Sequence, residues 1–238
     1  MKIGQIEIGK RPEIVLVLTS ELNDMDKLKE NLSFAKSLKV NFVEFRVDYL
    51  ENISKLSEIL DILGDYNFYI IGTIRPKFEG GLFPFDENRL ILFEQILEHP
   101  STYLVDIEFK SKIVKEVIEL AKKIKKYSIV SYHDFEKTPS AQEILKVYDE
   151  IYSLNPSFVK LSFKANSFED VKNLHFAMSQ RDHLKIYMSM GEFGAISRVD
   201  SFIFGSIFTY TFTQSPSAPG QLDLLTLKTI LKILYPLF

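Results

Sequence analysis

Several residue types that would carry a particular chemistry are absent or scarce in this sequence of 238 residues. Cysteine is absent, which excludes disulfide bonds, thiol nucleophiles and thiolate metal sites. The four histidines, His99, His133, His175 and His183, show no H-x-H or H-E-x-x-H spacing, and this disfavours a zinc or iron site. We therefore expect no bound metal and little dependence on cofactors.

The sequence also lacks a strong charge of one sign. Its 29 Lys and Arg residues against 32 Asp and Glu residues give a net charge of −3 without a basic block, so we expect no nucleic-acid surface. No stretch reaches the roughly 18 uninterrupted apolar residues that span a membrane. The first residues, MKIGQIEIGKRPE, contain no apolar segment typical of a signal peptide. We expect a cytoplasmic protein without a membrane segment.

Strand-like and helix-like patterns alternate along the chain. Short apolar or β-branched runs predict strands at 14–19, 42–48, 68–74, 103–109, 128–133, 158–163, 185–190 and about 204–210. Helical periodicity predicts helices at 24–38, 113–124 and 222–234. Such alternation implies a parallel sheet, and eight repeats are typical of a (β/α)₈ barrel, an α/β fold also called a TIM barrel.

We predict one (β/α)₈ barrel domain over residues 1–238. A doubly wound open sheet is the alternative, but the Gly-rich turn usual after its first strand is replaced here by TSELND (19–24). Weak alternation in residues 2–11 predicts a short N-terminal β-hairpin that closes one end of the barrel.

Polar or charged side chains occupy strand positions where a barrel core is normally apolar. In the second predicted strand, Glu44, Arg46 and Asp48 share one face. An exposed edge strand would explain one such case, but the feature recurs on other strands, at Thr73 and Arg75, Asp106 and Glu108, Ser131 and His133, and Lys160 and Ser162. Because barrel enzymes assemble their sites at the carboxyl ends of strands, these residues predict an active site.

Lys160 indicates the chemistry. A lysine within a strand is either an edge-strand gatekeeper or a buried amine, and a closed barrel without edges favours the buried amine. Burial and nearby Arg46, Arg75 or Arg198 would lower its pKa from about 10.4, and a neutral amine attacks ketones to form an imine. His133, at the end of the preceding strand, suits removal of the adjacent proton near neutral pH; a structural core histidine is the alternative.

Two arginines suggest an anionic substrate. Arg75 ends the third predicted strand and Arg198 follows the seventh, and a guanidinium group binds a carboxylate through two hydrogen bonds. Residues 215–221 precede the last helix, so their backbone amides and Ser217 are candidates for binding an oxygen-rich ligand. A plain turn explains their Pro, Gly and Ser residues equally well.

Eight segments together resemble one family, in unbroken order from about Ile14 to the C-terminus. They are VEFRVDYL (43–50), TIRPKFEGG (73–81), VDIEF (105–109), SYHDFEKTP (131–139), FVKLSF (158–163), MSMGEFGAISR (188–198), FGSIFTYTF (204–212) and SAPGQ (217–221). The patterns H-D-F-x-K-T-P and S-A-P-G-Q are the most specific. The sequence resembles type I 3-dehydroquinate dehydratase, the Schiff-base enzyme of the shikimate pathway.

The resemblance implies a barrel enzyme that converts 3-dehydroquinate to 3-dehydroshikimate without metal or cofactor, commonly as a homodimer. It implies that Lys160 forms the imine, that His133 removes and returns protons, and that Glu79 orients His133. The implied substrate contacts are Glu44, Arg46, Arg75, Arg198, Ser217 and Gln221, with Arg198 as the partner of the substrate carboxylate.

Some positions depart from the family pattern or leave alternatives open. SFKANS (162–167) replaces a small-residue and proline pattern, and Val17 stands where some members carry a serine. Lys164 is a rival nucleophile, although we expect it to be solvated. Residues 78–85 are predicted to form a mobile loop. An imine-forming aldolase and a non-catalytic ligand-binding barrel are the competing functions.

Overall fold

The protein is described by a computed structural model of residues 1–84 and 88–238; Phe85, the last residue of the predicted mobile loop, lies outside this description. The described residues form two compact units. We call Val15–Val130 the first-half unit, and Met1–Ile14 together with Ser131–Phe238 the second-half unit.

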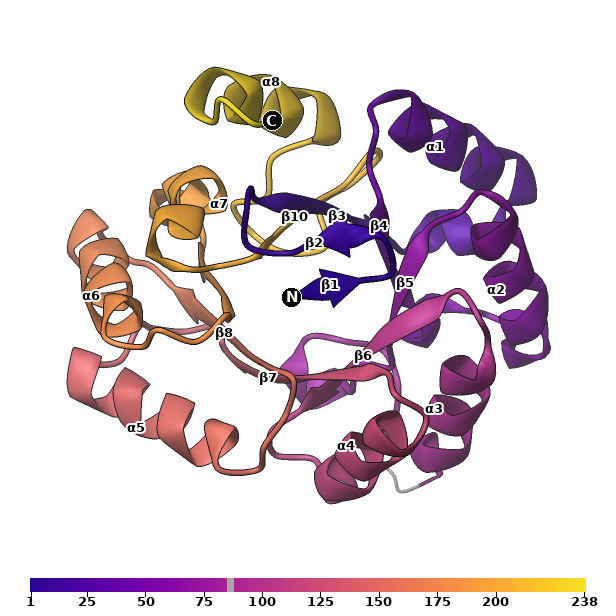
Figure 1. The fold of residues 1–238 in the computed structure, drawn as a ribbon, viewed down its shortest axis with the longest axis horizontal. Coiled ribbons are helices and arrows are strands. Elements are labelled where there is room, and N and C mark those ends of the chain that lie inside the picture. The colour runs from indigo at the N-terminus through magenta and orange to yellow at the C-terminus, as the bar shows by residue number, and fades with distance from the viewer. Residues whose placement is uncertain (85–87) are drawn as a thin grey trace. The chain divides into compact units, whose positions relative to one another are not determined.

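The first-half unit alternates parallel strands and helices. Its strands are β3 (Glu13–Leu18, shared with the other unit), β4 (Phe42–Arg46), β5 (Tyr69–Thr73) and β6 (Thr102–Glu108), and each pairs in parallel with the next. Its helices are α1 (Met25–Ser37), α2 (Leu56–Asp65), α3 (Arg89–Glu98) and α4 (Val114–Lys123). Figure 1 shows these helices in chain order along one side of the strands. In α4, for example, Val114, Val117, Ile118 and Ala121 recur at helical spacing and are buried.

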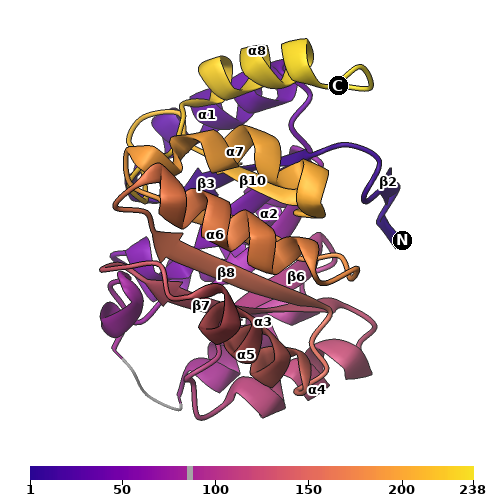
Figure 2. The same ribbon diagram turned by 90° about the vertical axis from the view of Figure 1, so that its left-hand side faces the viewer.

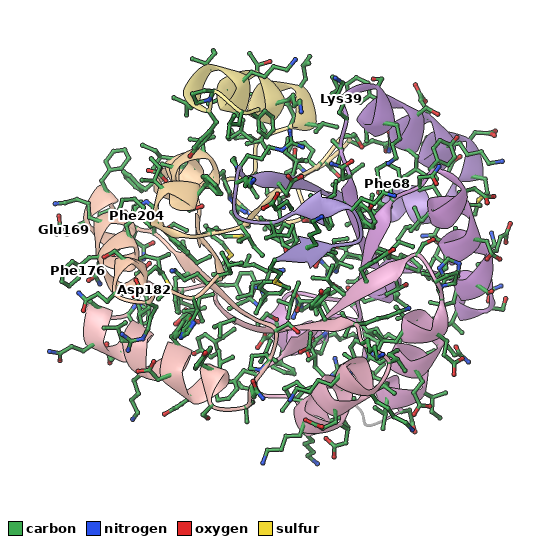
Figure 3. All side chains as sticks on the ribbon, in the orientation of Figure 1. Lys39, Phe68, Glu169, Phe176, Asp182 and Phe204 are labelled. Carbon is green, nitrogen blue, oxygen red and sulfur yellow. The ribbon has the colours of Figure 1, made fainter. Side chains whose placement is uncertain are left out.

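The second-half unit continues the alternation. Its strands are β7 (Tyr127–Asp134, shared with the other unit), β8 (Phe158–Lys164), β9 (Ile186–Met190) and β10 (Phe208–Thr211). Its helices, α5 (Ala141–Tyr152), α6 (Phe168–Ser179), α7 (Ser197–Asp200) and α8 (Leu224–Leu234), lie one beside the next in Figure 2. Ser140 and Ser167 begin α5 and α6 with capping boxes, and Glu169 and Phe176 stand on the solvent side of α6 (Figure 3).

The second-half unit also contains a short N-terminal hairpin. Strands β1 (Lys2–Ile3) and β2 (Ile6–Glu7) pair in antiparallel fashion, and the side chains of Ile3 and Ile8 are buried. The predicted hairpin is therefore confirmed. That it closes one end of a barrel stays a prediction.

The strand order confirms the predicted fold class. The parallel strands of the described residues form an eight-stranded sheet in the order β10-β3-β4-β5-β6-β7-β8-β9. Neighbours in the sheet are thus neighbours in the chain, and the last strand returns beside the first. This is the order of a (β/α)₈ barrel, whereas a doubly wound sheet reverses its strand order part-way.

Two predicted strand boundaries are wrong for local reasons. The last strand was expected to begin near Phe204, but that residue ends the 3₁₀ helix η6 (Ser201–Phe204), and β10 begins at Phe208. Gly205 follows with φ 93°, in the left-handed region that favours glycine, and this turn ends η6 before β10 begins. Asp48 was expected in a strand and lies in the 3₁₀ helix η2 (Val47–Tyr49).

Candidate active site

In the first-half unit, Arg75 lies at the centre of a buried cluster of charges. Its guanidinium donates from Nη2 to Asp106 Oδ1 at 2.7 Å and from Nη1 to Glu108 Oε1 at 3.1 Å. Glu79 Oε2 lies 3.8 Å from Nη1. The side chains of all four residues are buried. Burial opposes the charge of Arg75, but Asp106 and Glu108 outweigh it and raise its pKa above the ordinary value.

The predicted face of Glu44, Arg46 and Asp48 is buried, and each of its side chains has a hydrogen-bond partner. Arg46 donates to both oxygens of Asp48, at 2.8 and 2.7 Å, and Thr73 Oγ1 donates to Glu44 Oε1 at 2.8 Å. Asp48 also accepts the backbone N–H groups of Arg75 and Leu82, both at 3.2 Å. This unit therefore brings the predicted residues Glu44, Arg46, Arg75 and Glu79 to the carboxyl ends of β4 and β5 in a hydrogen-bonded arrangement.

In the second-half unit, Lys160 lies within β8 and its side chain is 4% exposed. Its Nζ lies 4.2 Å from the centre of the Tyr210 ring on β10, a distance typical of a cation–π contact. The buried-amine interpretation is therefore favoured over an exposed edge strand. Lys164, the rival nucleophile, is exposed as predicted.

His133 occupies the last part of β7, the strand next to β8 in the sheet. Its ring stacks on Phe135 with centroids 6.0 Å apart. Tyr132 and Phe163 pack against each other with ring centroids 6.0 Å apart, and side chains alternate between the two faces of a strand. His133 and Lys160 therefore point to the opposite face, as the predicted chemistry requires.

Arg198, in α7, differs from the arginines of the first-half unit. Its side chain is buried, its Nη1 donates to the thioether sulfur of Met188 at 3.0 Å, and its Nη2 donates to the carbonyl oxygen of Pro219 at 3.4 Å. Among residues 1–84 and 88–238, no carboxylate pairs with it, and its Nε is buried without a hydrogen-bond partner. Burial lowers the pKa of Arg198 to about 10, although Tyr210 acts in the opposite direction.

The predicted segment around Ser217 forms a turn closed by Gln221. The side-chain Oε1 of Gln221 accepts the backbone N–H groups of Ser217 at 2.7 Å and Ala218 at 3.3 Å. Within this turn, Pro219 contributes the carbonyl that accepts from Arg198. The second-half unit thus brings Arg198, Ser217 and Gln221 together.

Sequence reasoning missed three residues that contact the predicted ones. Tyr210 and Met188 are strand residues whose apolar surroundings predict only a core role, although they touch Lys160 and Arg198. Arg89, the first residue of α3, donates to Glu108 Oε2 at 2.9 Å. One sequence signal could have indicated that Arg89 is buried. It begins the apolar helix segment RLILFEQILE and lies on the same helix face as the buried residues Phe93 and Ile96.

Two kinds of feature are absent from residues 1–84 and 88–238. No group of three or more His, Asp or Glu side chains there is arranged to hold a metal ion. In the same residues, no helix is both long and apolar enough to cross a membrane.

The chain matches known proteins over almost its whole length. The model of the family described as Type I 3-dehydroquinase matches residues 16–237. The chain belongs to this family. A 3-dehydroquinate dehydratase from Hydrogenobaculum sp. is 40% identical over 192 residues, covering 79% of this chain and 86% of its own length. The enzyme from Pyrococcus abyssi is 38% identical over 210 residues, covering 88% and 94%.

A solved structure of the family has the same fold. The type I 3-dehydroquinate dehydratase from Clostridium difficile, crystallised with covalently modified comenic acid, superposes with a TM-score of 0.89 at 29% identity and covers 100% of this chain and 98% of its own. This type I 3-dehydroquinase is a carbon–oxygen lyase of the shikimate pathway, which leads to the aromatic amino acids.

Proposed function

We propose that the protein dehydrates 3-dehydroquinate through an imine on Lys160, with His133 as the general acid and base. The neutral amine of Lys160 adds to the substrate ketone and loses one water to form the imine. The protonated imine withdraws electrons, so His133 removes the proton from the adjacent carbon. His133 then protonates the departing hydroxyl, which leaves as water, and hydrolysis of the imine releases 3-dehydroshikimate and Lys160.

The observation that carries this proposal is the burial of Lys160 within a strand of a family dehydratase. A buried amine is shielded from bulk water, which favours the neutral form that attacks a ketone. The Clostridium difficile relative holds covalently modified comenic acid, which fits an enzyme family with covalent chemistry. His133 on the neighbouring strand, facing the same way as Lys160, supports its role as the proton carrier.

We propose Arg198 as the partner of the substrate carboxylate. Arg46 and Arg75 are already neutralised by Asp48, Asp106 and Glu108, whereas Arg198 is buried and has no carboxylate partner among the described residues. A buried cation without an anion gains most from a charged ligand. The substrate hydroxyl groups are then left to Glu44, Arg46, Arg75, Ser217 and Gln221, and Glu79 is proposed to orient His133.

The broader assignments are proposals as well. We propose a single domain over residues 1–238, because the family match runs without interruption from residue 16 to 237. We also propose a cytoplasmic homodimer that acts on 3-dehydroquinate without metal or cofactor and binds neither nucleic acid nor membranes. Light scattering of the purified protein tests the dimer, and dialysis against a chelator followed by an activity assay tests the independence from metal.

Borohydride trapping tests the catalytic proposal. We expect reduction in the presence of 3-dehydroquinate to leave a stable adduct on the peptide that contains Lys160, located by mass spectrometry. We expect Lys160→Ala to abolish both the adduct and the ultraviolet absorbance of the enone product, whereas Lys164→Ala retains both. An adduct on Lys164 or Lys110 would show that the nucleophile is assigned to the wrong residue.

The same assay separates the competing functions. An aldolase would cleave sugar phosphates when these are offered beside 3-dehydroquinate. A ligand-binding barrel would bind 3-dehydroquinate without forming the enone. Either result would contradict the proposed dehydration.

A further inference from the structure

We infer that Arg89, which lies outside the predicted site, is a positioning residue that holds Arg75 in place through Glu108. This inference rests on the proposed function, in which Arg75 contacts the substrate. Arg89 has no exposed surface, although it begins helix α3 rather than a strand. A fully buried arginine is rare unless it has specific partners.

Two of the three partners of Arg89 adjoin Arg75. Its Nη1 donates to Glu108 Oε2 at 2.9 Å and to the carbonyl oxygen of Ile74 at 2.8 Å, and its Nη2 donates to Ser111 Oγ at 2.9 Å. Ile74 is the residue directly before Arg75. Arg89 therefore holds both the backbone next to Arg75 and the carboxylate that binds the Arg75 side chain.

Glu108 is the link between the two arginines. Its Oε1 accepts from Arg75 at 3.1 Å and its Oε2 accepts from Arg89 at 2.9 Å, so each oxygen faces one guanidinium. The carboxylate has no exposed surface. Burial raises the pKa of Glu108, while Arg75 and Arg89 act in the opposite direction.

Removing Arg89 would change the binding arrangement of Arg75 in two ways. Glu108 would then have Arg75 as its remaining arginine partner. Because the carboxylate is buried, losing one cation favours its protonated, neutral form. Arg75 would then lose one of its anionic partners, and the backbone at Ile74 would lose a hydrogen bond. We expect the Arg75 guanidinium to leave the position in which it meets the substrate, so substrate binding weakens more than the chemical step on Lys160.

Steady-state kinetics of matched variants test this inference. In Arg89→Met, we expect KM to rise about tenfold or more while kcat stays within about threefold, since the loss of a charge-assisted hydrogen bond weakens binding by this order. Arg89→Lys keeps a cation beside Glu108, and we expect it to restore most of the wild-type KM. Glu108→Gln raises KM as well, and its effect combined with Arg89→Met is smaller than the product of the two single effects.

Lys185→Met is the control for a merely structural role. Lys185 is also a buried cation, but it lies in the second-half unit and donates to the carbonyl oxygens of Arg181 and His183. We expect this variant to lower the denaturation midpoint and to leave KM unchanged.

The outcomes distinguish the inference from the function on which it rests. A wild-type KM in Arg89→Met or in Glu108→Gln overturns the inference, as does an equal rise of KM in Lys185→Met. Should Arg89→Met fail to fold, Arg89→Lys and Glu108→Gln decide the matter by the same measurements. A wild-type protein that forms no enone from 3-dehydroquinate overturns the proposed function itself.

Discussion

Arg75, which follows β5, and Arg198, which lies in α7, are both buried, but their surroundings are opposite. In the first-half unit, Arg75 contacts Asp106 and Glu108, and its pKa is raised above the ordinary value. In the second-half unit, Arg198 contacts a thioether and a carbonyl oxygen, and burial lowers its pKa to about 10. One arginine is neutralised by the protein, whereas the other is not.

This difference indicates that Arg75 contributes mainly to the stability of the fold, whereas Arg198 contributes mainly to ligand binding. A buried ion pair is costly to break, because the remaining partner keeps its charge in a place without water. A buried cation without an anion lowers stability until a ligand supplies the charge. We therefore expect substitution of Arg75 to affect folding first and substitution of Arg198 to affect binding first.

Arg75→Met removes the arginine that is paired with carboxylates, and we expect it to have the largest effect on stability. The change leaves Asp106 and Glu108 buried with fewer cations, so we expect the free energy of unfolding to fall by about 3–5 kcal/mol. Urea denaturation followed by circular dichroism measures this loss. Adding Asp106→Asn removes one of the abandoned charges and should recover part of the stability; an undiminished loss in the double variant would contradict the electrostatic cause.

His133→Ala tests whether the proposed chemistry belongs to the second-half unit. Loss of a general acid and base lowers kcat by about a hundredfold or more. Because the side chain is only half-buried, the denaturation midpoint should change little. His183→Ala is the control, since His183 is exposed and stacks on Tyr152. Equal kcat values in the two variants would remove His133 from the mechanism.

Arg198→Met tests the other side of the comparison. We expect KM to rise by about tenfold to a hundredfold, the usual result of losing a charged hydrogen-bond pair. Since folding lowers the pKa of Arg198 to about 10, its charge disfavours the folded state below that pH, and the disadvantage disappears as the pH rises through the folded and then the unfolded value. At neutral pH the variant should therefore be no less stable than the wild type. A lower midpoint with an unchanged KM would reverse the comparison.

Asp223→Ala gives the smallest effect and serves as a calibration outside both arginine sites. Asp223 caps α8 by accepting the backbone N–H of Thr226 at 3.0 Å, and this bond lowers the pKa of the carboxyl. We expect a loss of about 1 kcal/mol near neutral pH and an unchanged KM. Because the folded pKa is lowered, the stabilisation is present above the unfolded value and is lost as the pH falls through the folded one. Equal losses at neutral and strongly acidic pH, measured by urea denaturation, would contradict this assignment.

Most of the fold could be predicted because strand and helix patterns are local. The β-branched runs and the apolar helix faces lie in the sequence itself, and seven predicted strands agree with the observed ones to within about two residues. The last strand was placed too early, because the apolar residues up to Phe204 form the 3₁₀ helix η6, which ends at the left-handed Gly205. A short apolar run does not distinguish a 3₁₀ turn from a strand, so the pattern could not place this boundary.

The members of the candidate site could be predicted better than their partners. Alternation along β4, β6 and β8 places Arg46, Glu108 and Lys160 on the polar faces. It does not show which carboxylate binds which arginine, because that depends on the register between strands, such as Thr73 opposite Asp106. Arg89 escaped prediction for the same reason, since its reach from a helix to Glu108 follows from tertiary packing.

The environment of the Arg198 guanidinium has a consequence for the choice of inhibitors. A methyl ester or an amide of the substrate has the right outline but brings no negative charge, so the guanidinium would stay unbalanced beside the sulfur of Met188 and the carbonyl of Pro219. The enzyme would therefore accept free acids and reject their neutral derivatives. An inhibitor delivered as an ester prodrug would need hydrolysis of the ester before it could bind.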